Sequence, residues 1–289
     1  MKRIILAAVF FFALCSCERR ISKERIADGN NTFTIRIGQP GIDLKNQYPG
    51  AVKVERQPAG LTFYQVNWRA TEKGKIKLDM SDSSLVFDDV LGMVGTEDNG
   101  EKNPGIYRLT IISKITDSNQ ISHEDARTKF LSILKKIKSS GWSTLIPFTA
   151  PRLRGKDMLN YLLETKNPTS LDSSYDLSIS EWMNIDNLTS WEFNKGKIFL
   201  EVSFSRTSEE IEAQAFASYV VRYTVKSDVA YFKEYVDSNA TESWESLLID
   251  ELKNSAERRR SLEERLEKNG IKIDKEYMNP KPPISSFDH

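Results

Sequence analysis

The first twenty residues place the strongest constraint on how and where this chain folds. Lys2 and Arg3 precede residues 4–14, an apolar run of eleven residues that carries no charge. This is the order of the cationic and apolar regions of a secretory signal. A helix of that length is too short to cross a bilayer core of roughly 30 Å. We therefore expect residues 1–16 to be a signal peptide that is removed, and the rest of the chain to fold outside the cytoplasm.

A cysteine follows the apolar run, directly after a small residue. Ser16 precedes Cys17, and the charged segment 18–20 comes next. The arrangement resembles the lipobox of bacterial lipoproteins, although Cys15 is a less usual residue two positions before the modified cysteine. It predicts cleavage before Cys17 and acylation of this residue, for example with palmitate. The alternative is an ordinary cleaved signal followed by a spare cysteine.

Acyl chains at Cys17 would set the location of the protein. Each buried methylene group contributes on the order of 0.8 kcal/mol, so several chains would hold the protein firmly on a membrane surface. We expect a periplasmic protein that is anchored to the bacterial membrane by lipid, and we favour the outer membrane over the inner one.

Cysteine usage and charge narrow what the exported chain can be. Without residues 1–16, Cys17 is the single cysteine left, so no disulfide can form within one chain. The full chain has 41 cationic and 41 anionic side chains, and loss of Lys2 and Arg3 leaves 39 against 41, a net charge of −2. Binding to nucleic acid needs a basic surface, so we expect no nucleic-acid partner. An apolar fraction of 39% with five Trp and fourteen Phe is enough for a packed core.

The exported chain is expected to begin with a tether and a β-rich lobe. Residues 17–31 are polar and charged, which is typical of a flexible tether. From residue 32 polar and apolar side chains alternate, as they do in half-buried strands, and we assign residues 32–120 to a lobe of mostly antiparallel sheet. The strands expected there cover residues 32–37, 52–56, 61–69, 75–80 and 106–115, with turns at Gly74 and residues 97–105.

Residues 121–289 are expected to form a second lobe that combines helices with a hairpin, which makes the fold class α+β. Ser122 and Asp125 have the spacing of a helix N-cap, and an apolar stripe with helical spacing continues from there towards Gly141. Further elements are short helices over 156–164, 180–185 and 228–236, a hairpin of 191–193 with 198–204, and a strand over 219–225. In the second strand of the hairpin, Glu201 is expected on the face opposite Leu200 and Val202. Whether the two lobes are one domain or two stays open.

The last predicted element is a long C-terminal helix over residues 241–268. Eleven of the eighteen positions from Glu251 to Lys268 are charged. Such a run is typical of a solvated face, and a surface that docks a partner is the alternative. Gly270 ends the helix, and a proline-rich tail follows.

Residues that could carry chemistry are sparse. We expect His123 to be an exposed side chain in the first turn of a helix, and the other histidine is the last residue, His289. Residues 132–135 match the S-x-x-K spacing of penicillin-binding proteins without the accompanying motifs, and the glycine pair at 92–95 is interpreted as a turn. Acidic residues 209–210 have no second acid placed opposite them. Since ligand sets for zinc and calcium are also missing, we expect no enzyme, no cofactor and no metal site.

Six stretches carry a resemblance to a known family, and none of them is a catalytic motif. They are residues 58–68, 95–98, 122–127, 151–156, 181–183 and 270–274. Through them the whole exported chain resembles proteobacterial lipoproteins that are encoded beside type VI secretion lipase effectors and look like their immunity proteins. The resemblance implies an envelope lipoprotein that binds a secreted phospholipase effector and inhibits it.

The sequence does not identify the residues that contact such a partner. A tight interface needs aromatic or arginine anchors. Tyr48, Tyr64, Trp68 and Trp142 could serve if they are exposed, but core packing explains each of them equally well. Two other functions stay open: a structural or accessory lipoprotein of an envelope complex that docks through residues 241–268, and, third, an enzyme.

Overall fold

The computed structural model describes residues 32–69, 71–101, 105–166, 169–207, 216–236 and 243–284. The expected signal peptide, the acylation site Cys17, the tether, residues 209–210 and His289 lie outside the described residues. Within the described part, no helix is long and apolar enough to span a membrane.

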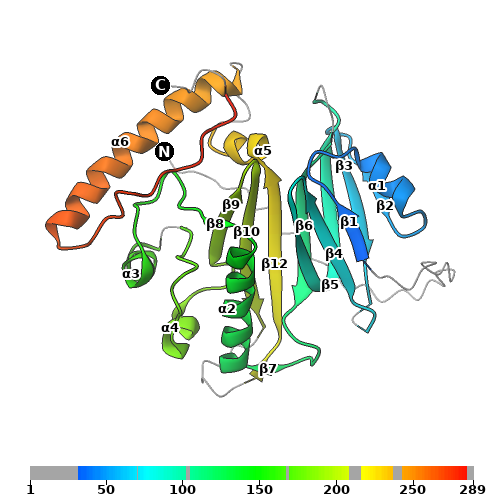
Figure 1. The fold of residues 1–289 in the computed structure, drawn as a ribbon, viewed down its shortest axis with the longest axis horizontal. Coiled ribbons are helices and arrows are strands. Elements are labelled where there is room, and N and C mark those ends of the chain that lie inside the picture. Colours follow the sequence, from blue (N-terminus) through cyan, green and yellow to red (C-terminus); the bar gives the residue numbers. More distant parts are fainter. Residues whose placement is uncertain are drawn as a thin grey trace.

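In this part of the chain, one ten-stranded sheet organises the fold (Figure 1). Its strands are β1 (Thr32–Ile35), β2 (Lys53–Arg56), β3 (Leu61–Asn67), β4 (Gly74–Met80), β5 (Ser83–Asp98), β6 (Ile106–Lys114), β8 (Ser143–Thr144), β9 (Ser190–Lys195), β10 (Ile198–Arg206) and β12 (Tyr219–Ser227). The spatial order is β1-β4-β5-β6-β12-β10-β9-β8, and β2 and β3 branch from β5. Only β1 and β4 pair in parallel among these strands. β7 (Ile121–Ser122) and β11 (Phe216–Ala217) form a separate antiparallel pair.

The sheet continues across the two lobes that the sequence suggests. β6 comes from residues 32–120 and β12 from residues 121–289, and they pair antiparallel from Arg108 with Lys226 to Lys114 with Val220. Buried side chains of both regions also belong to one hydrophobic cluster. Side chains from the two regions can therefore lie in register on a single sheet face.

The helices confirm the expected α+β class. They are α1 (Gly41–Gln47), α2 (His123–Ser139), α3 (Gly155–Thr165), α4 (Ile179–Asn184), α5 (Asp228–Lys233) and α6 (Trp244–Lys268). The predicted N-cap of α2 is confirmed, because the Ser122 hydroxyl accepts a hydrogen bond of 3.1 Å from the Asp125 amide. Figure 1 shows α2 lying along the strands and α6 standing at the outer side of the molecule.

Helices α1 and α2 cover the same face of the sheet. α2 places Phe130 on this face, with ring centroids 4.8 Å from Trp191 of β9 and 5.5 Å from Phe204 of β10. α1 contacts the same face at Tyr64 of β3. A row of buried residues runs in register beneath both helices: Tyr64, Gly95, Leu109, Val225, Leu200 and Phe193.

β5, the longest strand in the described residues, was not predicted from the sequence. The turn expected at residues 92–95 lies inside it, and Gly74, also expected in a turn, begins β4, so both predictions are wrong. β5 pairs with β4 up to Val90 and with β3 from Gly92, and the register is irregular between these two residues. This change of partner interrupts the strict alternation by which a strand is recognised.

Helix α1 was missed as well, because a helix of seven residues carries too little periodic signal. Its first residue is fixed by packing. A Cβ atom at Gly41 would lie 1.9 Å from Cε2 of the Tyr64 ring, so only glycine allows the helix to approach the sheet this closely.

Helices α5 and α6 pack over one end of the opposite sheet face. A second hydrophobic cluster joins them to the sheet, and its buried members are Leu145, Phe199, Tyr231, Phe232, Leu248 and Leu252. After α6 the chain turns back, and residues 269–284, which we call the C-terminal strap, run beside it (Figure 1). The expectation that the charges of α6 are solvated is wrong for Glu263, which is 5% exposed, and for Arg259, which donates to the carbonyl of Pro147.

Candidate functional site

The structure corrects the expected environment of His123. The side chain is fully buried, whereas we expected an exposed imidazole. Its Nδ1 lies 2.6 Å from the Tyr219 hydroxyl, which also accepts a hydrogen bond of 3.3 Å from Nε1 of Trp182. These three side chains join α2, β12 and α4 in the interior, so they stabilise the fold. The sequence around His123 indicates only the N-cap of a helix. It does not indicate that β12 and α4 pack around the histidine.

The four aromatic residues considered as exposed anchors belong to the core. Tyr64 is 4% and Trp142 is 3% exposed. Tyr48 and Trp68 are partly buried and pack against the main hydrophobic cluster. An interface has to be sought among other side chains.

The sheet face opposite α1 and α2 offers such side chains. A row in register crosses it from β2 to β9, and all its members are partly or fully exposed: Lys53, Gln65, Val94, Thr110, Thr224, Glu201 and Glu192. The neighbouring row adds Asn67, Gly92, Ile112 and Arg222. We call these two rows the open sheet face. A face of this mixed polarity is stable in water and can also take up a partner.

A cavity of about 240 Å³ lies at one end of the open sheet face. β9, β10 and β12 form its floor, and α5 with the residues just after it forms its wall. Glu192 of β9 and Glu201 of β10 both line it, and they are direct cross-strand neighbours. Like charges directly opposite each other destabilise a sheet, so this pair calls for a physical explanation.

Two cations compensate the other carboxylates of this cavity. Lys226 lies 2.9 Å from Glu234 and 3.7 Å from Glu201. Arg108 of β6 donates to Glu234 as well. Glu192 differs, because its carboxyl group takes part in no hydrogen bond and no ion pair with the described residues. Burial and, second, the charge of Glu201 raise the pKa of Glu192 to about 8.

The wall of the cavity that α5 and the residues after it form is aromatic. The Phe199 and Tyr231 rings stack with centroids 3.9 Å apart and planes 6° from parallel. The hydroxyl groups of Tyr231 and Tyr235 lie 2.8 Å apart, and burial raises the pKa of both phenols above the ordinary value. The cavity therefore combines an apolar wall with a carboxyl group that lacks a partner.

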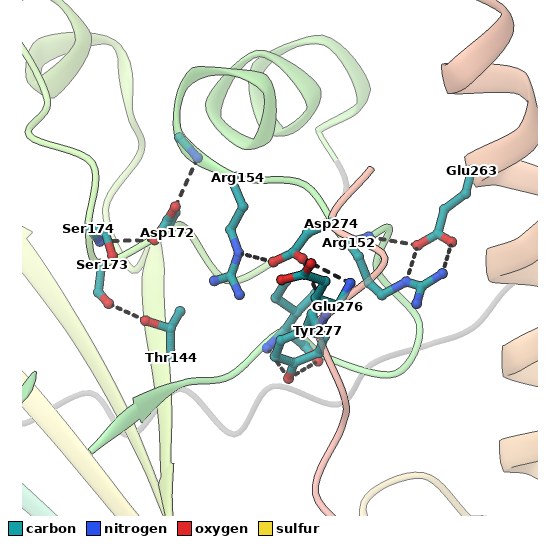
Figure 2. A network of polar contacts seen from close by, with 12 residues as sticks. Thr144, Arg152, Arg154, Asp172, Ser173, Ser174, Glu263, Asp274, Glu276 and Tyr277 are labelled. Carbon is teal, nitrogen blue, oxygen red and sulfur yellow. Dashed lines mark hydrogen bonds and ion pairs between the residues drawn. The ribbon is translucent and has the colours of Figure 1, made fainter. Parts of the chain in front are cut away.

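A second open space, a groove of about 650 Å³, lies between β8 and the C-terminal strap. Figure 2 shows the polar contacts beside it. Arg152 binds Glu263 of α6 through its backbone amide (2.9 Å), Nε (3.0 Å) and Nη2 (2.7 Å). Arg154 binds Asp274 of the strap at 2.7 Å. Since these charges are all paired, they fasten α6 and the strap to the fold, and we assign them a structural role.

Among the described residues, no three His, Cys, Asp or Glu side chains gather closely enough to hold a metal ion. The site that the geometry offers is the open sheet face with its acidic cavity. Sequence reasoning placed Glu201 on the strand face opposite Leu200 and Val202, and this alternation was the one available signal. It did not identify Glu192 or Glu234, because the cavity depends on pairing and packing between distant segments.

In comparisons with known proteins, the chain matches no family model, no curated protein and no solved structure.

Proposed function

We propose that the protein is an envelope immunity lipoprotein that binds a type VI secretion phospholipase effector and inhibits it. The observation that carries the proposal is the open sheet face, which presents side chains of β2, β3, β5, β6, β12, β10 and β9 to a partner on one continuous surface. The expected acylation at Cys17 and the family resemblance of the sequence support the same function.

An anchored inhibitor has a physical advantage over a free one. A phospholipase must reach the membrane surface to find its substrate. An inhibitor that is held at the same surface meets the enzyme at a raised effective concentration. The anchor thus improves protection without adding any contact to the interface.

The test is co-expression with the neighbouring genes, among which we expect a lipase effector, followed by co-purification and by challenge of cells with that effector. Arg222, an exposed residue of the open sheet face, is the position to change. Arg222→Glu reverses a charge there, and we expect at least a tenfold loss of affinity together with loss of protection. Arg260→Glu, at an exposed position of α6, is the matched control and should leave both unchanged.

The same variants separate the alternative function. If the protein is an accessory lipoprotein that docks through α6, Arg260→Glu will break its complex and Arg222→Glu will not. Absence of any lipase from the purified complex, together with no protection of challenged cells, would reject the immunity function.

A further inference from the structure

The acidic cavity holds more carboxyl groups than cations. Three carboxyl groups belong to it, those of Glu192, Glu201 and Glu234, and two cations face them, Lys226 and Arg108. Both cations bind Glu234, and Lys226 also reaches Glu201. Neither cation forms an ion pair with Glu192. A third cation placed between Glu192 and Glu201 would allow Glu192 to ionise beside Glu201 without repulsion.

We propose that this cavity receives a basic side chain, an arginine guanidinium or a lysine ammonium group, from the protein that binds the open sheet face, and that Glu192 is its acceptor. The inference rests on the proposed function, since the same partner delivers the side chain. Glu192 and Glu201 end one row of the open sheet face, so a partner seated on that face reaches the cavity without a further rearrangement.

The shape and lining of the cavity fit this occupant. A long basic side chain has an apolar stem and a charged end. Phe199, Tyr231 and Pro147 offer the stem an apolar wall, while Glu192 lies on the floor. An anion would be repelled by the carboxylates of Glu201 and Glu234, and a purely apolar group would leave the Glu192 carboxyl group without a hydrogen bond.

Binding of a cation here is coupled to a proton. The titratable groups around Glu192 come from every element packed against it: Glu201 of β10, Lys226 of β12, Tyr231 of α5, Glu234 and Tyr235 just after α5, and Tyr277 of the C-terminal strap. With a pKa of about 8, Glu192 carries a proton at neutral pH when the cavity is empty. A cation prefers the ionised form, so its affinity should rise with pH up to that value.

The first experiment uses the protein alone, with ethylguanidinium chloride as the probe and ethylurea as a neutral probe of the same shape. Binding is followed by NMR chemical shifts at constant ionic strength. We expect ethylguanidinium to bind about 50-fold more tightly at pH 8 than at pH 6, the ratio of the ionised fractions of Glu192. Glu192→Gln should abolish this binding, and Glu264→Gln at an exposed position of α6 should not change it.

Three results would overturn the inference: equal binding of the two probes, no shift change in the cavity at any concentration, or unchanged binding in Glu192→Gln. Circular dichroism of the variant shows whether it is folded, and the neutral glutamine matches the protonated glutamate in shape.

The second experiment uses the complex with the lipase effector, and it separates this inference from the proposed function. We expect Glu192→Gln to weaken the complex at least tenfold, because one partner of a desolvated charge pair is lost. If the effector binds and Glu192→Gln leaves its affinity unchanged, the cavity is not the acceptor although the function stands. If ethylguanidinium binds but no effector does, the function is wrong although the cavity recognises a cation.

Discussion

The raised pKa of Glu192 leads to a prediction about the stability of the protein, which can be tested without any binding partner. Replacing Glu192 with glutamine keeps the size of the side chain and removes the ionisation. The pKa of Glu192 is raised from an ordinary value of 4.5 to about 8 in the folded protein, chiefly by burial. Between these two values the folded state holds a proton that the unfolded state has released. The free energy of unfolding of the wild type therefore falls as pH rises.

The magnitude follows from the proton difference. One proton corresponds to about 1.4 kcal/mol per pH unit, so the loss from pH 5 to pH 8 is up to about 4 kcal/mol. This contribution is fully present below pH 4.5 and is lost as pH rises towards 8, the sign expected for an acid whose folded-state pKa is raised. The variant Glu192→Gln lacks this pH-dependent contribution to the free energy of unfolding. It should match the wild type at pH 5 and exceed its stability by up to about 4 kcal/mol at pH 8.

Urea unfolding followed by tryptophan fluorescence at pH 5, 6, 7 and 8 measures this difference on the purified protein. Contributions from titrating groups that do not interact with Glu192 cancel when the variant is subtracted from the wild type. Glu264→Gln, at an exposed position, should give a difference that does not vary with pH. Parallel stability profiles of the wild type and Glu192→Gln would refute the reasoning, because Glu192 would then titrate as it does in the unfolded chain.

Three further outcomes are expected. Glu263→Gln should lower the free energy of unfolding at pH 7 by about 2 kcal/mol, because charged hydrogen bonds to Arg152 are lost. Burial alone would raise the pKa of Glu263, but hydrogen bonds from Arg152 outweigh burial and hold this pKa below its ordinary value of 4.5. Urea unfolding should therefore show that the deficit of the variant shrinks as pH falls through the lowered pKa of the folded protein. Tyr219→Phe should cost about 1–3 kcal/mol in the same assay, because it removes the partner of His123, while effector binding stays unchanged. Cys17→Ser should abolish metabolic labelling with palmitate, and labelling that persists would contradict acylation at this residue.

Local signals predicted the described helices α2 to α6 but not α1. The long helix α6 and the start of α2 follow from capping and periodicity that a dozen neighbouring residues contain. The two central strands of the second lobe, β10 and β12, alternate from Leu200 and from Val221 onward and were also expected.

Elements that depend on distant residues were not predicted. β5 carries Asp88 and Asp89 where its partner changes, and its apolar alternation breaks there, so the sequence resembles a loop. The burial of His123 depends on Tyr219, almost a hundred positions further along the chain. Short-range periodicity contains neither piece of information.

The acidic cavity was beyond sequence reasoning for the same reason. The alternation of β10 correctly predicted that Glu201 lies on the strand face opposite its apolar neighbours. The hairpin register sets Glu192 directly beside it, and the position of α5 brings Glu234 over both. No pattern within one segment shows that three carboxyl groups lie together and that two cations pair with only two of them.

Inhibition of the effector tests the central claim most directly. The phospholipase effector that the proposed function requires is purified and assayed on phospholipid vesicles while the protein is added in increasing amounts. Our account predicts that lipase activity falls to the background at about one molar equivalent, as a tight complex requires, and that Arg222→Glu shifts the titration to much higher amounts. Full lipase activity in the presence of a large excess of the wild-type protein would contradict it.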